Sequence, residues 1–188
     1  MIRSLILITA LLACACSRQP APVANVAEVL PDDALADEVP NDQGQPFITE
    51  VMAALEHADR VVLVEHSFET DFPTTPGPND PPSRERSYKR VELSEAQVSG
   101  LRNRLAAMSP HVASYVSACV YIPHHRLEFF RGEKLVQRME ICLTCGQLEW
   151  DGVHTTEPGD FYRTFSDFLK ETGFEPDRNW ELLARQPE

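Results

Sequence analysis

Apolar residues are unevenly distributed along the chain and divide it into three parts. The first thirteen residues are almost all apolar, residues 14–46 contain no aromatic side chain, and residues 47–188 mix apolar and polar positions throughout. This last part is long enough to bury one hydrophobic core. We therefore expect a single globular domain over residues 47–188, preceded by two extensions, residues 1–13 and 14–46.

Within the domain, apolar residues that recur every three or four positions predict three helices. These helices cover residues 47–58, 94–109 and 161–172. Ser94 and Gln97 form the sequence pattern of a capping box, which marks the start of the second helix, and Pro110 ends it.

Alternating or continuous apolar runs predict the strands. They cover residues 60–68, 87–93, 115–122, 126–131 and 134–142, and residues 147–151 are a candidate for a further strand. Gly132 and Glu133 supply a tight hairpin turn, whereas the prolines of residues 71–83 allow only a loop. The order of elements predicts an α+β fold, an antiparallel sheet of about four to six strands with two or three helices packed on one face.

The apolar N-terminus has the pattern of a secretory signal peptide. Arg3 supplies the positive charge, and an apolar run of eight residues follows at positions 5–12. A membrane-spanning helix needs about 20 apolar residues, so this run is too short to remain in the bilayer. It is typical of the apolar core of an export signal.

The sequence Leu11-Leu12-Ala13-Cys14 resembles the lipobox of bacterial lipoproteins. The resemblance implies that the Cys14 sulfur receives a diacylglyceryl group and that cleavage occurs before Cys14. Leu12 is bulkier than the residue usual at that position, which leaves Cys16 as an alternative site. No Asp follows either cysteine, so the resemblance favours the periplasmic face of the outer membrane within the bacterial cell envelope.

Residues 14–46 are predicted to be a disordered acidic stalk. The segment holds five prolines and six acidic residues, with Arg18 as its only cation. Such a composition leaves too little apolar surface to offset chain entropy. The expected role of the stalk is to space the domain from the lipid headgroups, and the alternative is an acidic interaction tail.

The net charge of the chain is -12. Nucleic acid binding requires cations that neutralise phosphates, and no basic cluster supplies them, so no nucleic acid partner is expected. The expected partners are the membrane, through the lipid anchor, and an envelope protein of unknown identity.

One cluster of chemistry-bearing residues remains in the domain, made of three cysteines and a histidine: Cys119, His125, Cys142 and Cys145. An oxidising compartment favours a disulfide, between Cys119 and Cys145 or between Cys142 and Cys145. The four side chains also have the ligand types of a zinc site, and the thiols could instead be buried as small apolar groups.

The hairpin turn predicts how these residues face one another. With Gly132 and Glu133 as the two turn residues, Cys119 lies opposite Gly146, and His125 lies opposite Glu140 and diagonal to Cys142. Cys142 and Cys145 would point to opposite faces of a straight strand. They can converge only where the chain bends after Cys142.

The segment from Cys119 to His125 and the later Cys142-Leu143-Thr144-Cys145 resemble a set of uncharacterised bacterial secreted proteins and lipoproteins. Those proteins share a Cys, aromatic, Pro, His stretch followed by Cys-x-x-Cys at a strand end. The similarity covers roughly residues 86–170. Leu143 stands where those sequences usually have an aromatic residue. The resemblance implies homology and brings no known activity.

These observations favour a non-enzymatic envelope lipoprotein, a tethered interaction or structural module. The alternative is a metal-binding or redox-linked envelope protein that uses the cysteine and histidine cluster. A thiol-dependent enzyme is the weakest hypothesis, because nothing in the spacing selects Glu128 or Glu140 to orient a histidine base. No catalytic or cofactor-binding residue is predicted beyond the zinc alternative, and His57, His66, His111 and His154 are expected at the surface or in loops.

Overall fold

The computed structural model describes residues 42–72, 85–113 and 118–186. By its contacts the chain divides into two units, Met1–Asp37 and Glu38–Glu188, and every described residue belongs to the second. The predicted signal peptide, Cys14, Cys16 and most of the predicted stalk lie outside the described residues. Among the described helices, none has the length and apolarity that crossing a bilayer requires.

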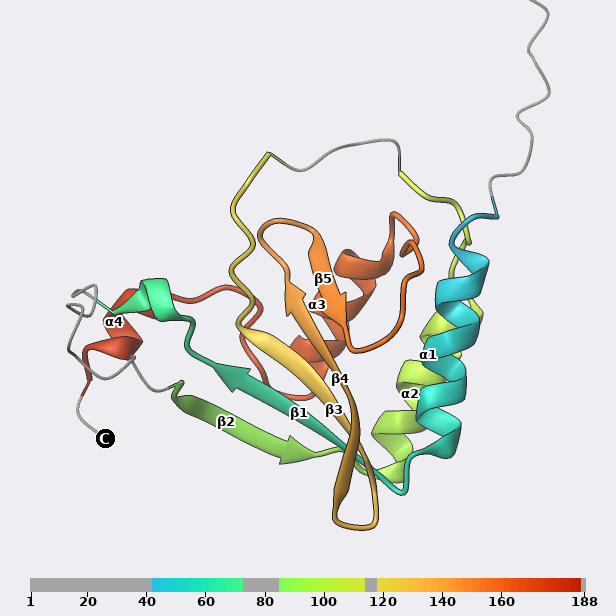
Figure 1. Ribbon diagram of the computed structural model, residues 1–188, viewed down its shortest axis with the longest axis horizontal. Coiled ribbons are helices and arrows are strands. Elements are labelled where there is room, and N and C mark those ends of the chain that lie inside the picture. Colours follow the sequence, from blue (N-terminus) through green and yellow to red (C-terminus); the bar gives the residue numbers. More distant parts are fainter. Residues whose placement is uncertain (1–41, 73–84, 114–117, 187–188) are drawn as a thin grey trace, which may run out of the picture. The chain divides into compact units, whose positions relative to one another are not determined.

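The domain has an α+β fold, as predicted (Figure 1). In chain order its elements are α1 (Gln45–His57), β1 (Arg60–His66), the 3-10 helix η1 (Glu69–Asp71), β2 (Ser87–Glu92), α2 (Glu95–Ala106), β3 (His125–Arg131), β4 (Lys134–Cys142), β5 (Gln147–Trp150), α3 (Phe161–Glu171) and α4 (Trp180–Ala184). The strands form one antiparallel sheet in the order β2-β1-β3-β4-β5.

One face of the sheet carries the main hydrophobic core, and we call it the helical face. Alternate residues of β1 and β3, such as Leu63 and Phe129, pack there against α1, α2 and α3. The phenylalanines that share one side of α3, among them Phe165, are buried in the same core. Burial of each large apolar side chain contributes about 1.5–3 kcal/mol, so this face supplies most of the driving force for folding.

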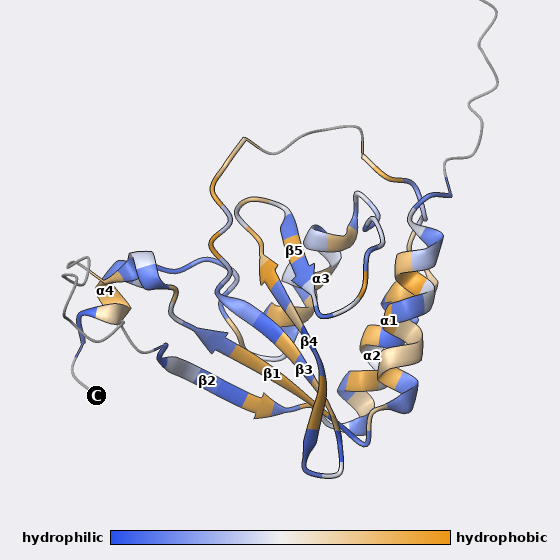
Figure 2. Ribbon diagram, viewed as in Figure 1, coloured by the Kyte–Doolittle hydropathy of each residue, from blue (hydrophilic) through white to orange (hydrophobic). Residues whose placement is uncertain are grey.

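The opposite face of the sheet, which we call the open face, carries a much smaller apolar cluster. Val62, Val64 and Phe130 are buried there, with Leu135 packed beside them. Hydrophobic and hydrophilic residues both occur along the strands of the sheet (Figure 2). Among the described elements no helix packs on this face, and its remaining positions are largely charged.

The start of α2 follows the predicted capping box. The Ser94 backbone N–H donates to Gln97 Oε1 at 2.9 Å, and the Gln97 backbone N–H donates to Ser94 Oγ at 3.3 Å. Two otherwise unpaired donors of the first helical turn are thereby satisfied.

Helix α1 begins at Gln45, two residues before the predicted domain boundary. The preceding Gly44 is buried, and its N–H donates to Pro110 O at 2.9 Å. A Cβ atom on Gly44 would lie 2.6 Å from that oxygen, so no larger residue fits. The last residues of the predicted stalk therefore belong to the folded domain.

The prediction of a strand at 115–122 is wrong for its described part. Residues 118–122 form no strand. β3 begins only at His125, and both of its sides are paired, with β1 and with β4. Tyr121 instead donates from its hydroxyl to the backbone oxygen of Glu140 at 3.2 Å.

The β3–β4 hairpin follows the predicted register only near its turn. Gly132 adopts a positive φ of 54°, and Phe130 pairs with Leu135 as expected. A β-bulge then shifts the register by one residue, so that His125 pairs with Ile141 and not with Glu140. Because successive side chains alternate between faces, the bulge changes which residues share a face with His125.

Candidate functional site

Buried polar residues gather where β1 ends and β3 begins. The described residues of this kind are Glu65, His66, Ser67, Asp71, His125, Arg126 and Glu128. Burying a polar or charged side chain costs free energy unless it is paired. This end of the β1–β3 pair, with its buried polar and charged side chains, is therefore the candidate functional site.

Arg126 is the centre of an ion-pair network on the open face. Its guanidinium donates twice to the Glu85 carboxylate, at 2.8 and 2.5 Å. It also lies 3.0 Å from Glu128 Oε1 and 3.4 Å from Glu140 Oε1. Arg90 reaches the second oxygen of Glu128 at 2.6 Å. The network therefore joins β2, β3, β4 and Glu85, which lies two residues before β2.

Glu85 and Arg126 favour the charged form of each other. Burial opposes ionisation of Glu85, but the hydrogen bond and charge of Arg126 outweigh it and hold the Glu85 pKa below its ordinary value. Burial likewise opposes the charge of Arg126, and its three carboxylate neighbours outweigh that effect and raise its pKa. Glu85 and Arg126 are therefore both charged at neutral pH, and their opposite charges offset each other.

His66 extends the network to the end of β1. Its Nδ1 lies 3.0 Å from the Ser67 backbone oxygen and its Nε2 lies 3.0 Å from Glu140 Oε2. A carbonyl and a carboxylate are both acceptors, so both bonds can form together only when both ring nitrogens carry hydrogens. The side chain is 2% exposed, which corrects the expectation of a surface histidine.

His124 and His125 lie beside Trp180 of α4. The His124 ring stacks on the indole with centroids 4.1 Å apart, and His125 meets the indole edge-on at 5.6 Å. His124 Nε2 lies 3.2 Å from both carboxylate oxygens of Asp71. His125 Nε2 donates to the backbone oxygen of Glu175 at 3.1 Å. Both rings therefore hold the C-terminal segment against the sheet.

Burial keeps these two rings uncharged. It lowers the pKa of His125 to about 3, and the hydrogen bond to Glu175 only partly opposes this. Burial also lowers the pKa of His124, although the neighbouring Asp71 acts in the opposite direction. At neutral pH the two histidines are therefore neutral hydrogen-bonding and stacking groups.

The C-terminal segment is held by two further polar contacts. Arg178 forms an ion pair with Glu65, a side chain that is 0% exposed. Arg86 donates to the backbone oxygens of Ala184 and Gln186 at 2.9 and 2.7 Å. Phe174, just after α3, is still buried in the apolar core. The later residues of the segment are held mainly by these polar and aromatic contacts.

The predicted disulfide is present between Cys119 and Cys145, whose Cα atoms lie 5.7 Å apart. Cys142 is the one cysteine of the described residues that lies outside a disulfide, and its side chain is buried. Of the two pairings left open by the sequence, the structure adopts the one that ties the segment before β3 to the β4–β5 turn.

The four predicted zinc ligands do not converge. His125 shares the helical face with its partner Ile141, so the adjacent Cys142 points to the open face. The β-bulge is the physical reason, because the register predicted from the turn alone would have put both on one face. Across the described ranges, no three His, Cys, Asp or Glu side chains are grouped so that they could hold a metal ion.

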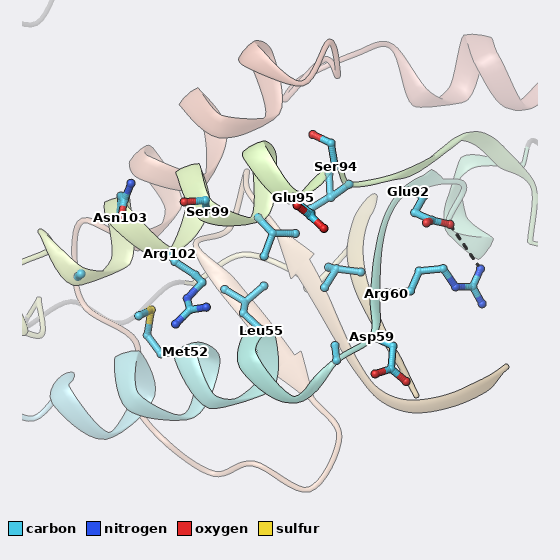
Figure 3. Close-up of a pocket in the computed structure, with 15 residues that line it drawn as sticks. Met52, Leu55, Asp59, Arg60, Glu92, Ser94, Glu95, Ser99, Arg102 and Asn103 are labelled. Atoms are coloured by element: carbon cyan, nitrogen blue, oxygen red, sulfur yellow. Dashed lines mark ion pairs between the residues drawn. The ribbon is translucent and has the colours of Figure 1, made fainter. Parts of the chain in front are cut away.

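A groove of about 790 Å³ lies between α1, α2 and the start of β1, away from the buried polar residues (Figure 3). Met52 and Leu55 of α1 line its apolar side, and Ser99 and Arg102 of α2 line its polar side. The charged residues Asp59, Arg60, Glu92 and Glu95 also line the groove. Figure 3 shows the Arg102 side chain extending from α2 toward α1. Within the described part of the chain, Arg102 makes no ion pair or hydrogen bond.

Sequence reasoning did not single out most residues of the candidate site. Arg126 and Glu128 carried one usable signal, because they alternate with Leu127 and Phe129 and so had to share the face opposite the core. Asp71 and Trp180 have no such signal in the sequence. They reach the site only because η1 and the C-terminal segment fold back against the end of the sheet.

No protein-family model matches the chain, and searches among curated proteins and among solved structures also find no match.

Proposed function

We propose that this chain is a lipid-anchored protein of the bacterial cell envelope whose domain is a non-catalytic interaction module. The anchor rests on the lipobox-like sequence that ends at Cys14 and on the acidic, proline-rich segment after it. The favoured location is the periplasmic face of the outer membrane. The partner is an envelope protein.

The groove between α1 and α2 is the surface that we propose binds the partner. Within residues 42–72, 85–113 and 118–186 no ionic partner contacts Arg102, which lines the groove together with the apolar side chains of Met52 and Leu55. A guanidinium suits bidentate recognition of a carboxylate. The complementary surface is therefore a segment of the partner that offers a carboxylate next to an aliphatic side chain.

The contacts of the buried polar residues support a role without catalysis. The imidazoles of His66, His124 and His125 are each engaged with an acceptor of the fold. A general base must instead reach the proton of a nucleophile or substrate. These residues are better explained as the internal framework of one end of the sheet.

The anchor is tested by labelling cells with palmitate and fractionating their membranes. Cys14→Ala should abolish labelling and release the protein from the membrane fraction, whereas the matched Cys16→Ala should change neither. Labelling that survives Cys14→Ala would move the anchor to Cys16, and an unlabelled wild-type protein would refute the lipoprotein proposal.

The interaction is tested with a photo-crosslinking amino acid at position 99, in the groove, or at position 163, on the exposed side of α3. We expect a discrete crosslinked species in the native envelope from position 99 alone. The change Arg102→Glu should suppress that species. Equal crosslinking from both positions, or none from position 99, would contradict the proposal.

A further inference from the structure

Two cysteines, Cys142 and Cys145, lie at the β4–β5 turn, and Cys119 is joined to the second by the disulfide. Cys142 is the last residue of β4 and pairs with Gln147 of β5, so the chain reverses direction over residues 143–146. Cys145 lies inside this reversal, and Gly146 closes it with a φ of 57°. The bend that the sequence requires for Cys142 and Cys145 to converge is therefore present.

The reversal brings Cys142 within reach of Cys145. Residues three apart in a tight turn have Cα atoms within about 7 Å, and a disulfide needs a separation of about 4.4–6.8 Å. Cys145 can thus pair with Cys119, as in the structure, or with Cys142, as in the other pairing that the sequence allows.

The segment that carries Cys119 contacts the end of β4. Tyr121, two residues after Cys119, donates its hydroxyl proton to the backbone oxygen of Glu140, two residues before Cys142. Burial raises the pKa of Tyr121, and the neighbouring Glu149, Glu140 and Cys142 add to this effect. The disulfide and the Tyr121 hydrogen bond therefore fix the segment of Cys119 beside the turn that carries Cys142 and Cys145.

We propose that Cys142 exchanges into the disulfide and thereby converts Cys119 into a surface thiol. The Cys142 thiolate attacks Sγ of Cys145, the bond between Cys145 and Cys119 breaks, and the electron pair leaves on Cys119 Sγ. Cys119 then takes up a proton equivalent to the one that Cys142 lost. One disulfide is replaced by another, so no oxidant or reductant is consumed.

The accessibility of the sulfurs favours this direction of attack. Cys142 and Cys145 are 1% and 6% exposed, whereas Cys119 is exposed to solvent. Water stabilises a departing thiolate better than an apolar interior does. Cys119 is therefore the better leaving group, and the new disulfide lies inside the fold.

The exchanged form has a modification site that the initial form lacks. Its ligand class is a disulfide: the Cys119 thiolate attacks one sulfur of an external disulfide, forms a mixed disulfide, and expels the second sulfur as a thiolate. In an oxidising compartment such disulfides are abundant. This inference does not depend on the proposed groove interaction.

The test uses the purified full-length chain at mildly alkaline pH. Native protein is incubated with dithionitrobenzoate as the external disulfide, quenched in acid, digested, and mapped by peptide mass spectrometry. We expect the label to accumulate on Cys119 while the Cys119–Cys145 peptide disappears and a Cys142–Cys145 peptide appears. The matched change Cys142→Ala should leave Cys119–Cys145 intact and Cys119 unlabelled.

Label on Cys142 with Cys119–Cys145 intact would overturn the exchange. So would three domain cysteines that stay unlabelled until the protein is denatured. The wild-type measurement alone decides between these outcomes. The test therefore remains decisive even where the Cys142→Ala variant fails to fold.

Discussion

The two faces of the sheet use the same strands but are stabilised in different ways. Along β1, Val61 and Leu63 enter the core beneath the helices, whereas Val62 and Val64 face the other side and are followed there by His66. The helical face relies on apolar packing. The open face, around Arg126, relies on ion pairs that satisfy one another.

This difference predicts how each face responds to change. Apolar packing tolerates substitutions that conserve volume. In an ion-pair network, removal of one member leaves its partners buried without compensation. The helical face should therefore be sensitive to size and the open face to charge.

The largest effect should come from the helical face. Phe129 is 0% exposed and lies beside Trp150 with ring centroids 6.3 Å apart. Phe129→Ala should lower the free energy of unfolding by about 4 kcal/mol, because it removes apolar contacts and leaves a cavity. Chemical denaturation measures this, with the half-exposed Val136→Ala as a control that should cost far less.

Arg126→Ala should produce the largest loss on the open face, about 2–3 kcal/mol, because it leaves three carboxylates without their shared cation. Arg126→Lys keeps the charge but not the bidentate bond to Glu85, so it should recover only part of the loss. Equal stability of all three proteins in denaturant titrations would show that the network contributes nothing measurable.

The neutral state of His125 predicts a dependence on pH. The folded pKa is lowered to about 3, so below about pH 6.5 the unfolded chain binds a proton that the folded chain does not. Stability should therefore fall as the pH is lowered, and this residue accounts for about 2 kcal/mol between pH 7 and pH 5.

Denaturation of His125→Gln across this pH range should show a shallower decline than the wild type, whereas the exposed His154→Gln should keep the wild-type slope. Equal slopes for wild type and His125→Gln would contradict the assignment.

The smallest effect should come from an ion pair at the surface. Lys170 Nζ lies 3.2 Å from Asp167 Oδ1 on α3, and both side chains are at least half exposed. Lys170→Ala should change the free energy of unfolding by less than about 0.5 kcal/mol. A cost as large as that of Arg126→Ala would remove the distinction between buried and exposed charges.

The periodic part of the fold is predictable from the sequence, and its irregular parts are not. The Phe161, Phe165 and Phe168 spacing determines the buried side of α3, and Ser94 with Gln97 marks the start of α2. These features depend on residues close together in the chain, so local pattern is sufficient to find them.

The candidate site depends on contacts between residues far apart in the chain, which a local sequence pattern cannot predict. One bulged residue in the β3–β4 pairing puts His125 and Cys142 on opposite faces, so the ligands of the alternative zinc site do not converge. His66 meets Glu140 across 74 positions of the chain. Of the cysteine pairings left open, only the tertiary path of residues 118–124 selects Cys119 with Cys145.

The positions of the two tryptophans have a practical consequence for spectroscopy. Trp150 lies in the apolar core next to Phe47, and Trp180 stacks on His124 at the polar end of the sheet. Since the chain has only these two indoles, Trp150→Phe and Trp180→Phe proteins each fluoresce from one region alone. Denaturation midpoints that coincide in the two proteins would identify one cooperative unit. An earlier transition from Trp180 would show that the C-terminal segment opens while the core stays folded.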